Sequence, residues 1–532
     1  MNVDGPVPAA GRLVQTIEEF LADHPGAAVL EDGRILFDMR IARYAVTETH
    51  SRCLLQLWSE ERNLVRTVVE LQQRAQCRRI MTRRMGAPKP QALELVATND
   101  RRTPTARDSG RRNYLRILER VLSREFIGSK IEGLRSAMDL EHSFGPAYVR
   151  GRLVRGTAAE AVIGVSEAEP APTVDGILTL GILWLEYCRQ RDDGRRHFGG
   201  LKVIVPEGAS RTTAERMAWL NHSVAQFQLF TLDERSEQLT PVDFRDIGNL
   251  ESHLVHAFST SAAIERCQQG IDRVMALLPP DARDRVEVCP RSAAQVALLL
   301  HGLEFARVRR GATGHSFSRE TEVTFGAGAN ETQLNDETED LCRELCIRLF
   351  ASRHPGGSHN NPLFRMQPER WLEAEVRCRI AQLSPGLRAD LMYSQIPALS
   401  CGERGMLDLL TLDRDSRLVV IELKADEDLQ LPLQALDYWI RVRALNADRK
   451  PGTGSDRSLS AFERQSYFVG TEVSARSPRL LLAAPALRIH PANEPVLRYL
   501  SPEIDWELIA LSEHWRRELN VVFRKRPGER KR

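Results

Sequence analysis

Two carboxylates and a lysine occupy matched positions near the ends of two adjacent predicted strands. The run Leu418–Leu423 consists of aliphatic and β-branched residues between turn residues, which predicts a buried strand. Alternation along that strand places Glu422 and Lys424 on the same face. The residues before it predict another strand and a hairpin turn, which would bring Asp408 beside Glu422. The spacing therefore predicts two hard oxygen ligands and one cation in one place.

This set of residues suits metal-assisted hydrolysis of a phosphodiester. Asp408, Glu422 and the carbonyl of Leu423 would offer Mg²⁺ or Mn²⁺ the oxygen ligands that such ions prefer. Lys424 would orient the attacking water or help to deprotonate it, with a pKa shifted by its charged and partly desolvated neighbours. The alternative is a structural Glu–Lys pair on an exposed sheet face.

The wider constellation resembles the PD-(D/E)xK nuclease superfamily. Asp408 is followed by Glu422-Leu423-Lys424 and then by Gln434-Ala435-Leu436-Asp437-Tyr438, similar to the Gln-x-x-x-Tyr of RecB-type helicase-nucleases and lambda-exonuclease-like enzymes. The pattern also resembles the C-terminal nuclease domain of archaeal and actinobacterial mismatch-type endonucleases. Met406 and Leu407 stand where a proline would precede the acid, and that proline is dispensable in many members. The resemblance covers residues 365–525.

The resemblance implies roles for three more residues. In similar nucleases a glutamate on the first helix reaches the metal, so Glu373 is expected there, with Glu369 as the alternative. Gln434 would help to hold the lysine or a substrate phosphate, and Tyr438 would support it or stack. Simpler explanations stay open, because first-turn acids also suit the helix dipole and Gln434 and Tyr438 also fit helix packing.

The elements around these residues predict an α/β fold. A helix begins at Pro368, and its apolar residues recur at helical spacing until Pro385-Gly386. Further elements are predicted at 392–398 (strand), 432–444 (helix), 479–484 (strand), 490–499 (helix) and 505–511 (strand). This order predicts a restriction-endonuclease-like mixed sheet flanked by helices, the fold that the resemblance implies.

The N-terminal half contains a similar order of predicted helices and strands. Its predicted elements are a helix at 115–126, strands at 148–153 and 160–165, a helix at 177–189 and a strand at 201–205. Aligned on the second strand, this half has Gly164 in place of Glu422 and Ser166 in place of Lys424. Arg150 has the spacing of the first carboxylate. We therefore expect a degenerate copy of the same fold without metal ligands, a suggestion by fold analogy.

Length and composition predict a multidomain globular protein. A chain of 532 residues is too long for one core, and 42% hydrophobic with 27% charged residues is typical of soluble proteins. The predicted domains are a small β-rich, basic domain (1–100), an α/β, degenerate nuclease-like domain (101–250), a helical connecting module with a linker (251–365), the nuclease-like domain (366–525) and a basic tail (526–532). Within the connecting module, a helix is expected at 292–309.

Charge predicts local rather than uniform contacts with DNA. The net charge is only +2, whereas residues 62–125 carry sixteen Lys or Arg and six acids. A segment so rich in arginine could contact a phosphate backbone. The residues expected to do so are Arg78, Arg79, Arg83, Arg84, Arg111 and Arg112. The alternative is a solvated face or a set of charge partners for acids elsewhere.

The chain has no run of eighteen apolar residues and no basic-then-apolar leader, which predicts neither a membrane partner nor secretion. Nine scattered cysteines favour reduced thiols and a cytoplasmic location. The sequence therefore predicts a metal-dependent DNA nuclease of repair, recombination or defence. Without a helicase motif, unwinding would need a helicase or repair partner, and a homodimer and a chain acting alone are both open. The alternative is a non-catalytic nucleic-acid-binding or scaffold protein that retains a nuclease-like fold.

Overall fold

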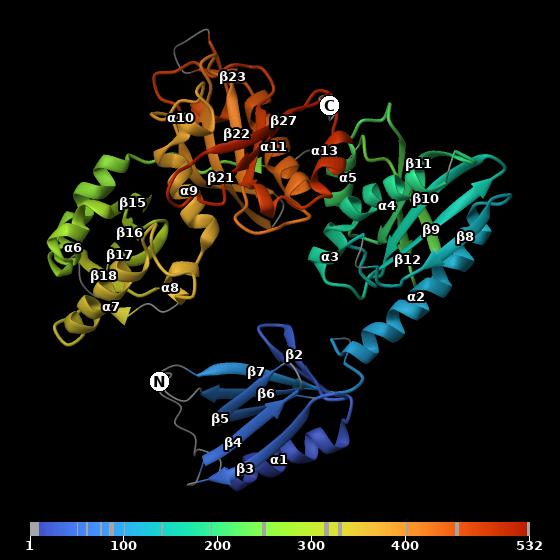
Figure 1. Ribbon diagram of the computed structural model, residues 1–532, viewed down its shortest axis with the longest axis horizontal. Helices are drawn as coiled ribbons and strands as arrows, with labels where there is room; N and C mark the ends of the chain where they lie inside the picture. The colour runs from blue at the N-terminus through green and yellow to red at the C-terminus, as the bar shows by residue number, and fades with distance from the viewer. Residues whose placement is uncertain are drawn as a thin grey trace. The chain divides into compact units, whose positions relative to one another are not determined.

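The computed structural model describes residues 10–49, 52–59, 62–74, 77–83, 90–100, 102–139, 142–192, 194–246, 252–312, 319–327, 332–400, 403–452 and 457–528. They form a mixed α/β protein with several sheets (Figure 1). The chain divides into two compact units, 1–213 with 226–242 and 214–225 with 243–532. This division does not follow the boundary predicted at residue 365. No helix among the described residues has the length and apolar character needed to cross a membrane.

The first unit begins with a seven-stranded antiparallel sheet, in the order β2-β1-β7-β6-β5-β4-β3. Helix α1 (Ala10–Asp23) lies along this sheet (Figure 1). Its Ile17 and Phe20 share a buried core with Leu55 and Ile80 of the sheet. The strands are β1 (Ala28–Glu31), β2 (Arg34–Asp38), β3 (Arg43–Thr49), β4 (Arg52–Trp58), β5 (Asn63–Arg74), β6 (Cys77–Arg83) and β7 (Gln91–Val96).

The same unit contains a six-stranded mixed sheet, in the order β13-β12-β11-β10-β9-β8. Its central pairs β10–β11 and β11–β12 are parallel, and its other pairs are antiparallel. The elements are α2 (Pro104–Glu125), β8 (Lys130–Arg135), β9 (Tyr148–Arg155), β10 (Ala158–Val165), α3 (Ala171–Asp175), α4 (Ile177–Arg191), β11 (His197–Pro206), α5 (Arg211–Met217), β12 (Gln226–Asp233) and β13 (Gln238–Val242).

The second unit contains a seven-stranded mixed sheet, in the order β14-β20-β21-β22-β25-β26-β27. Its elements are β14 (Ser252–His253), α8 (Pro362–Arg365), α9 (Pro368–Cys378), α10 (Ile380–Leu383), β20 (Tyr393–Ser400), β21 (Glu403–Leu412), β22 (Leu418–Leu423), α11 (Leu431–Ala447), β23 (Lys450–Pro451), β24 (Ser458–Leu459), α12 (Ala461–Arg464), β25 (Arg479–Pro485), η2 (Ala486–Arg488), α13 (Asn493–Arg498), β26 (Asp505–Leu511) and β27 (Val521–Lys525). Strands β23 and β24 pair only with each other.

The two mixed sheets share one topology. In each, three antiparallel strands are followed by a crossover helix, two parallel strands and a final antiparallel strand. Strands β8 to β13 thus correspond to β20, β21, β22, β25, β26 and β27, and α4 corresponds to α11. The C-terminal sheet differs by the added edge strand β14. The similar order of predicted elements in the two halves therefore reflects a repeated arrangement of strands.

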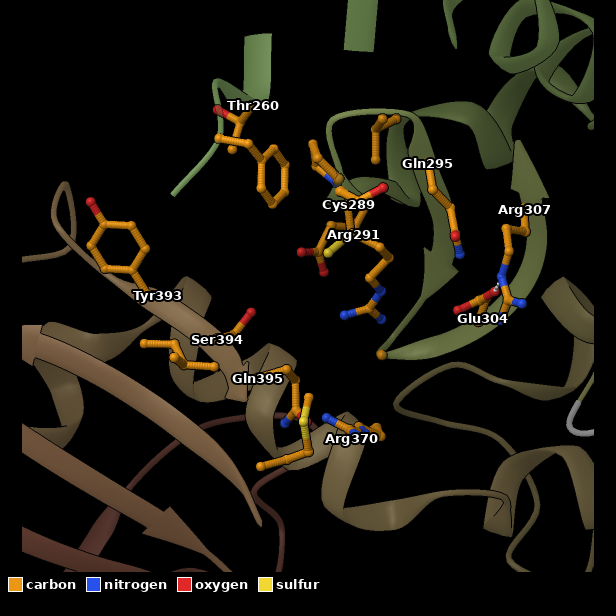
Figure 2. Close-up of a pocket in the computed structure, with 18 of the residues that line it drawn as sticks. Thr260, Cys289, Arg291, Gln295, Glu304, Arg307, Arg370, Tyr393, Ser394 and Gln395 are labelled. Carbon is orange, nitrogen blue, oxygen red and sulfur yellow. Dashed lines mark hydrogen bonds and ion pairs between the residues drawn. The ribbon is translucent and has the colours of Figure 1, made fainter. Parts of the chain in front are cut away.

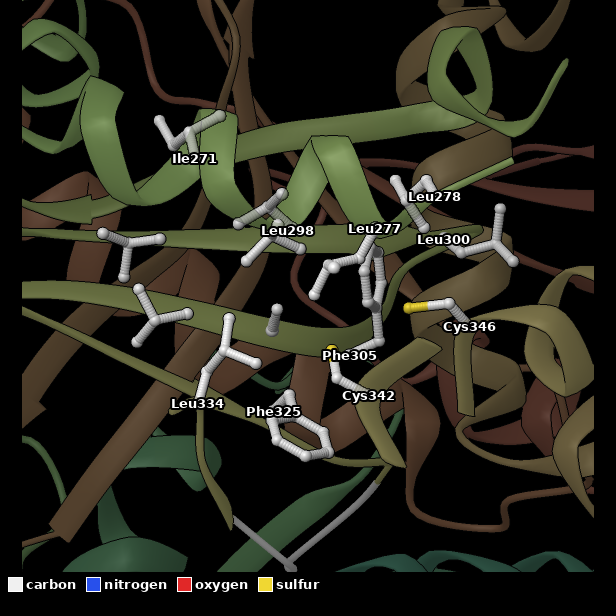
Figure 3. Packing of buried hydrophobic residues seen from close by; sticks show 14 of the residues in the cluster. Ile271, Leu277, Leu278, Leu298, Leu300, Phe305, Phe325, Leu334, Cys342 and Cys346 are labelled. Carbon is white, nitrogen blue, oxygen red and sulfur yellow. The ribbon is translucent and has the colours of Figure 1, made fainter. Parts of the chain in front are cut away.

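The connecting module is a sheet with helices and not a mainly helical segment. Five antiparallel strands run in sequence order between two helices, and their shared core is shown in Figure 3. The elements are α6 (Thr260–Leu277), η1 (Pro280–Arg285), β15 (Val286–Ser292), β16 (Gln295–Leu300), β17 (Leu303–Ala312), β18 (Arg319–Phe325), β19 (Thr332–Gln333) and α7 (Glu339–Ser352).

The helix predicted at residues 292–309 is wrong, because this segment forms most of a β-hairpin. Val296 to Leu300 are all buried, and the chain then reverses at His301 and Gly302, which have φ of 45° and 73°. Two successive positive φ values make the tight turn that matches strand twist. The Ala- and Leu-rich composition favours a helix locally, but burial of one face of the strands in a core shared with α6 and α7 overrides that preference.

The hairpin turn packs closely on α9. A Cβ on Gly302 would lie only 2.0 Å from the carbonyl oxygen of Arg370, so this contact admits only glycine. The imidazole of His301 stacks on Trp371, with ring centroids 4.8 Å apart, and its Nδ1 lies 3.2 Å from the carboxylate of Glu375. These contacts join the five-stranded module to the helix that carries Glu369 and Glu373.

Arg353 also holds the five-stranded module against α9. Its guanidinium is fully buried, lies over the Trp371 ring and donates to the carbonyls of Leu300, His301, Leu363 and Met366 at 2.7–3.0 Å. Replacing it with methionine would leave four buried acceptors without a donor.

We expect Arg353→Met to lower the free energy of unfolding by about 3–5 kcal/mol. Chemical denaturation followed by circular dichroism would measure this as an earlier transition midpoint. Arg348→Met on α7 is the matched control, because the Arg348 side chain is 71% exposed and contacts only Glu344 among the described residues. Equal midpoints for the two variants would contradict the anchoring role.

Candidate active site

The β21–β22 hairpin sets the positions of the candidate ligands. Leu409 lies opposite Ile421 in its register. The turn is closed by Asp413, whose Oδ1 accepts the backbone N–H groups of Asp415 and Arg417 at 2.9 and 3.0 Å. One residue further from this turn come Asp408 and Glu422, on adjacent strands.

Asp408 is held against the end of β22. Its Oδ2 accepts the backbone N–H of Leu423 at 2.9 Å, which ties the carboxylate to the peptide between Glu422 and Leu423. Burial raises the pKa of Asp408 above its usual value, although this hydrogen bond and Lys424 oppose the effect. The Asp408 carboxylate is therefore poorly solvated.

Glu422 is the most deeply buried acid of the cluster. Its side chain lies in β22, where every residue is buried, and it is only 3% exposed. Burial and the charge of Asp408 raise its pKa well above the ordinary value. Its Oε2 has no hydrogen-bond donor among the described residues. A buried carboxylate oxygen without a donor is costly unless a cation meets it.

Lys424 lies among three carboxylates. Its Nζ is 3.7 Å from Glu369, 3.8 Å from Glu422 and 3.7 Å from Asp428. Burial alone would lower the pKa of Lys424, but these carboxylates outweigh burial and raise it. Lys424 is therefore an ammonium group at neutral pH and not a ready proton acceptor. Asp428 thus belongs to the same charge cluster.

Glu373 reaches Asp408 through Gln395. Gln395 Nε2 donates to Glu373 Oε2 at 2.7 Å and lies 3.4 Å from Asp408 Oδ1. Glu373 is 6% exposed, and burial raises its pKa although Arg370 pairs with it at 3.0 Å. Glu373 thus lies on the Asp408 side of the site, whereas Glu369 lies on the Lys424 side.

Sequence reasoning missed Gln395. Its φ is 54°, an uncommon value for a residue other than glycine, and its Oε1 has no hydrogen-bond partner among the described residues. A glutamine within a predicted strand gives no signal of such a role. Only the positive φ, visible in the structure, marks the position as strained.

Helix α11 brings Tyr438 into electrostatic reach of the acids. Burial, followed by the charges of Glu422 and Asp408, raises the pKa of Tyr438. Gln434 is half-buried, and its side chain makes no hydrogen bond with the described residues. The helix itself is fixed by Arg216, whose guanidinium donates to both oxygens of Asp437 at 2.9 and 2.7 Å.

The arginines expected to contact DNA are spread over two elements. Arg78, Arg79 and Arg83 lie in β6, and alternation sends Arg78 and Arg79 to opposite faces of its sheet. Arg78 also lies over the ring of Phe20. In α2, Arg111 pairs with Glu169 at 2.6 Å, while Arg112 Nε donates to the carbonyl of Asp108. Arg84 lies outside the described residues.

The N-terminal copy has an arginine where the C-terminal copy has its first acid. Arg150 lies opposite Ile163, and its guanidinium lies over Trp184 of α4, while the charge of Asp408 acts on Tyr438 of α11 and raises its pKa. Continuing the register of each hairpin places Ile163 at the position of Glu422, one residue earlier than the expected Gly164. Gly164 faces α2 instead, where an added Cβ would meet the Tyr114 hydroxyl at 2.5 Å.

By the same register, Val165 and not Ser166 takes the position of Lys424. Arg150 is fully buried, and its Nε and Nη1 have no hydrogen-bond partner among the described residues. It lies 4.6 Å from the Phe144 ring centroid, a cation–π contact that partly offsets its burial. This site lacks every carboxylate of its counterpart.

The C-terminal site has a donor set that suits a divalent cation. Glu422 and Glu373 are buried and Asp408 is half-buried, all three have raised pKa values, and Glu422 Oε2 lacks a donor. Within the described part of the chain, no three acidic, histidine or cysteine side chains are already spaced around a single metal position. Instead, the amide of Gln395 and the ammonium of Lys424 lie between the acids.

Comparison with models of protein families finds no match to this chain, and comparison with curated protein sequences finds none either.

Proposed function

We propose that this chain is a divalent-metal-dependent deoxyribonuclease whose C-terminal domain has the restriction-endonuclease-like fold. The observation that carries the proposal is the buried Glu422 Oε2 without a donor, beside Asp408 and Lys424. Enclosing the carboxylates of Asp408, Glu422 and Glu373 in one place destabilises a fold, so a cation in the working protein gives a physical reason for the arrangement.

Asp408, Glu422, Glu373 and the carbonyl of Leu423 would hold Mg²⁺ or Mn²⁺. When bound, the ion would polarise the scissile phosphate and lower the pKa of a coordinated water. Lys424, charged at neutral pH, would stabilise the negative charge that develops on the phosphate and orient the water. Tyr438 would remain protonated and offer a hydroxyl donor near Glu422, because its pKa is raised.

The second candidate is a non-catalytic nucleic-acid-binding or scaffold protein. The N-terminal half favours it, because that half repeats the strand order with Arg150 and Ile163 at the positions of Asp408 and Glu422. In that case the C-terminal acids would be remnants.

Incubation of the full chain with supercoiled plasmid, linear duplex, single-stranded and branched DNA separates the two candidates. We expect cleavage of at least one substrate with Mg²⁺ or Mn²⁺ and none with a chelator. Binding of DNA without cleavage of any substrate under either metal would favour the scaffold. Addition of a helicase or a repair protein to the cleavage assay would test whether such a partner is needed for unwinding. We also propose a cytoplasmic location and the formation of a homodimer.

A further inference from the structure

A cavity of about 1050 Å³ lies beside the candidate metal site, within the second unit (Figure 2). Strands β15 to β18 of the five-stranded module line one side of it, and β20 and α9 line the other. The contacts of Gly302 and Arg353 described above hold these two sides together. The cavity therefore belongs to the packed structure of this unit.

The cavity leads to the acids. Gln395 lines it and donates to both Glu373 and Asp408. Arg370 also lines it and pairs with Glu373 at 3.0 Å. A chain that occupies the cavity would thus touch two residues in direct contact with the proposed metal ligands.

The lining carries an excess of positive charge. Four arginines (Arg291, Arg307, Arg370 and Arg377) face two glutamates (Glu287 and Glu304), so these six residues sum to +2. Arg377 pairs with Glu287, and Arg307 pairs with Glu304 at 2.6 Å.

Arg291 is the exception. It has no carboxylate or hydrogen-bond partner among the described residues, although it is half-buried. Figure 2 shows its guanidinium extending from β15 toward Gln395 and Arg370. An unpaired guanidinium that points into a cavity is a ready partner for a phosphate, which it can contact through two N–H groups.

The cavity also offers an aromatic surface. Phe258 is half-buried in its wall and stacks on no other ring in the described part of the chain. Tyr393 lies at one end, with Arg307 and Glu304 at the other (Figure 2). A cationic groove with a free aromatic ring is the combination by which proteins bind single-stranded nucleic acid.

The size of the cavity selects against a duplex. A cube of 1050 Å³ has an edge of about 10 Å, less than the roughly 12 Å width of the major groove of duplex DNA alone. Unpaired nucleotides can enter such a space one after another, whereas a base-paired helix cannot.

We propose that this cavity binds a single DNA strand, with a phosphate on Arg291 and a base against Phe258, and delivers that strand to the carboxylates. The inference rests on the proposed nuclease function and specifies its substrate class as unpaired DNA, such as an end, a flap or a gap. The five-stranded module is then the part of the chain that selects the substrate.

The test measures binding without metal, so that it does not depend on cleavage. A short fluorescent DNA strand, and the same strand annealed to its complement, are titrated with the full chain in the presence of a chelator. We expect the single strand to bind about tenfold more tightly than the duplex, with affinity that falls as salt rises.

Arg291→Glu is expected to weaken single-strand binding about tenfold and to reduce the salt dependence by about one phosphate contact. Phe258→Ala should weaken it by a similar factor through lost stacking. Arg283→Glu is the matched control, because Arg283 is an exposed arginine of the same module outside the cavity, and it should stay within about twofold of wild type. Unchanged circular dichroism would show that all variants fold.

Equal loss in Arg291→Glu and Arg283→Glu would overturn the proposal, as would equal affinity for duplex and single strand or no binding of either. Failure of the nuclease proposal looks different. In that case the single strand would bind through Arg291, yet no DNA would be cut when metal is added. Conversely, if Arg291→Glu leaves metal-dependent cleavage intact, the cavity is not the route of the substrate, while the proposed nuclease function stands.

Discussion

Asp408→Asn and Glu422→Gln are expected to reduce metal-dependent DNA cleavage on the order of 10³-fold or more, because each removes a charged ligand at the point where the ion must act. The same variants should not destabilise the metal-free protein. Burial raises the pKa of both acids, so their ionised forms oppose folding, and a neutral amide of the same shape removes that opposition. Nuclease assays and thermal unfolding in chelator measure the two effects.

The sign of the pH effect follows from the same shifts. A carboxyl whose pKa is higher in the folded than in the unfolded chain destabilises the fold increasingly as pH rises above its ordinary value, about 4.5 for Glu422. The difference in thermal stability between Glu422→Gln and wild type should therefore grow from acid to neutral pH. Added Mg²⁺ or Mn²⁺ should stabilise wild type but not Glu422→Gln. If Glu422→Gln cut DNA as fast as wild type, Glu422 would be excluded as a metal ligand.

Lys424→Met is expected to lose cleavage by a factor of about 10²–10³ and, unlike the acid variants, to lose stability. Its removal leaves the carboxylates of Glu369, Glu422 and Asp428 facing one another without a cation. We expect the free energy of unfolding in chelator to fall by about 1–3 kcal/mol. Thermal unfolding of the metal-free variant measures this loss.

Lys424→Arg provides the matched control. It keeps the positive charge but replaces a compact ammonium with a planar guanidinium, so it should retain stability and still cut slowly. If Lys424→Met were as active as wild type, the lysine would be only a charge partner for the acids. If Lys424→Met were as stable as wild type, the charge of Lys424 would not be needed to offset the repulsion among the three carboxylates.

Much of the C-terminal sheet was predictable because its strands are short apolar runs between turn residues. Strand β26 begins and ends at the predicted residues Asp505 and Leu511, and the β21–β22 hairpin is present with its turn at Asp413. The first helix was predicted as one element, but it breaks at Arg379 into α9 and α10. The restriction-endonuclease-like identity of this fold stays a prediction.

The connecting module shows where local signals fail. Residues 292–309 have a composition that favours a helix, yet their neighbours in α6 and α7 bury them as strands. The repeated topology was visible in the N-terminal half, but its register was off by one residue. Strand pairing is set by partners on other strands, so spacing along a single strand cannot fix it.

The sequence by itself determined which chemical groups are present, and that Asp408 comes before a predicted hairpin turn while Glu422 and Lys424 come after it. Tertiary structure alone decided how deeply each group is buried, which groups surround Lys424, and that Gln395 joins Glu373 to Asp408. It also formed the cavity lined by Arg291. The reason is that solvation and Coulomb energy depend on distances in space, and those distances are set by segments far apart in the chain.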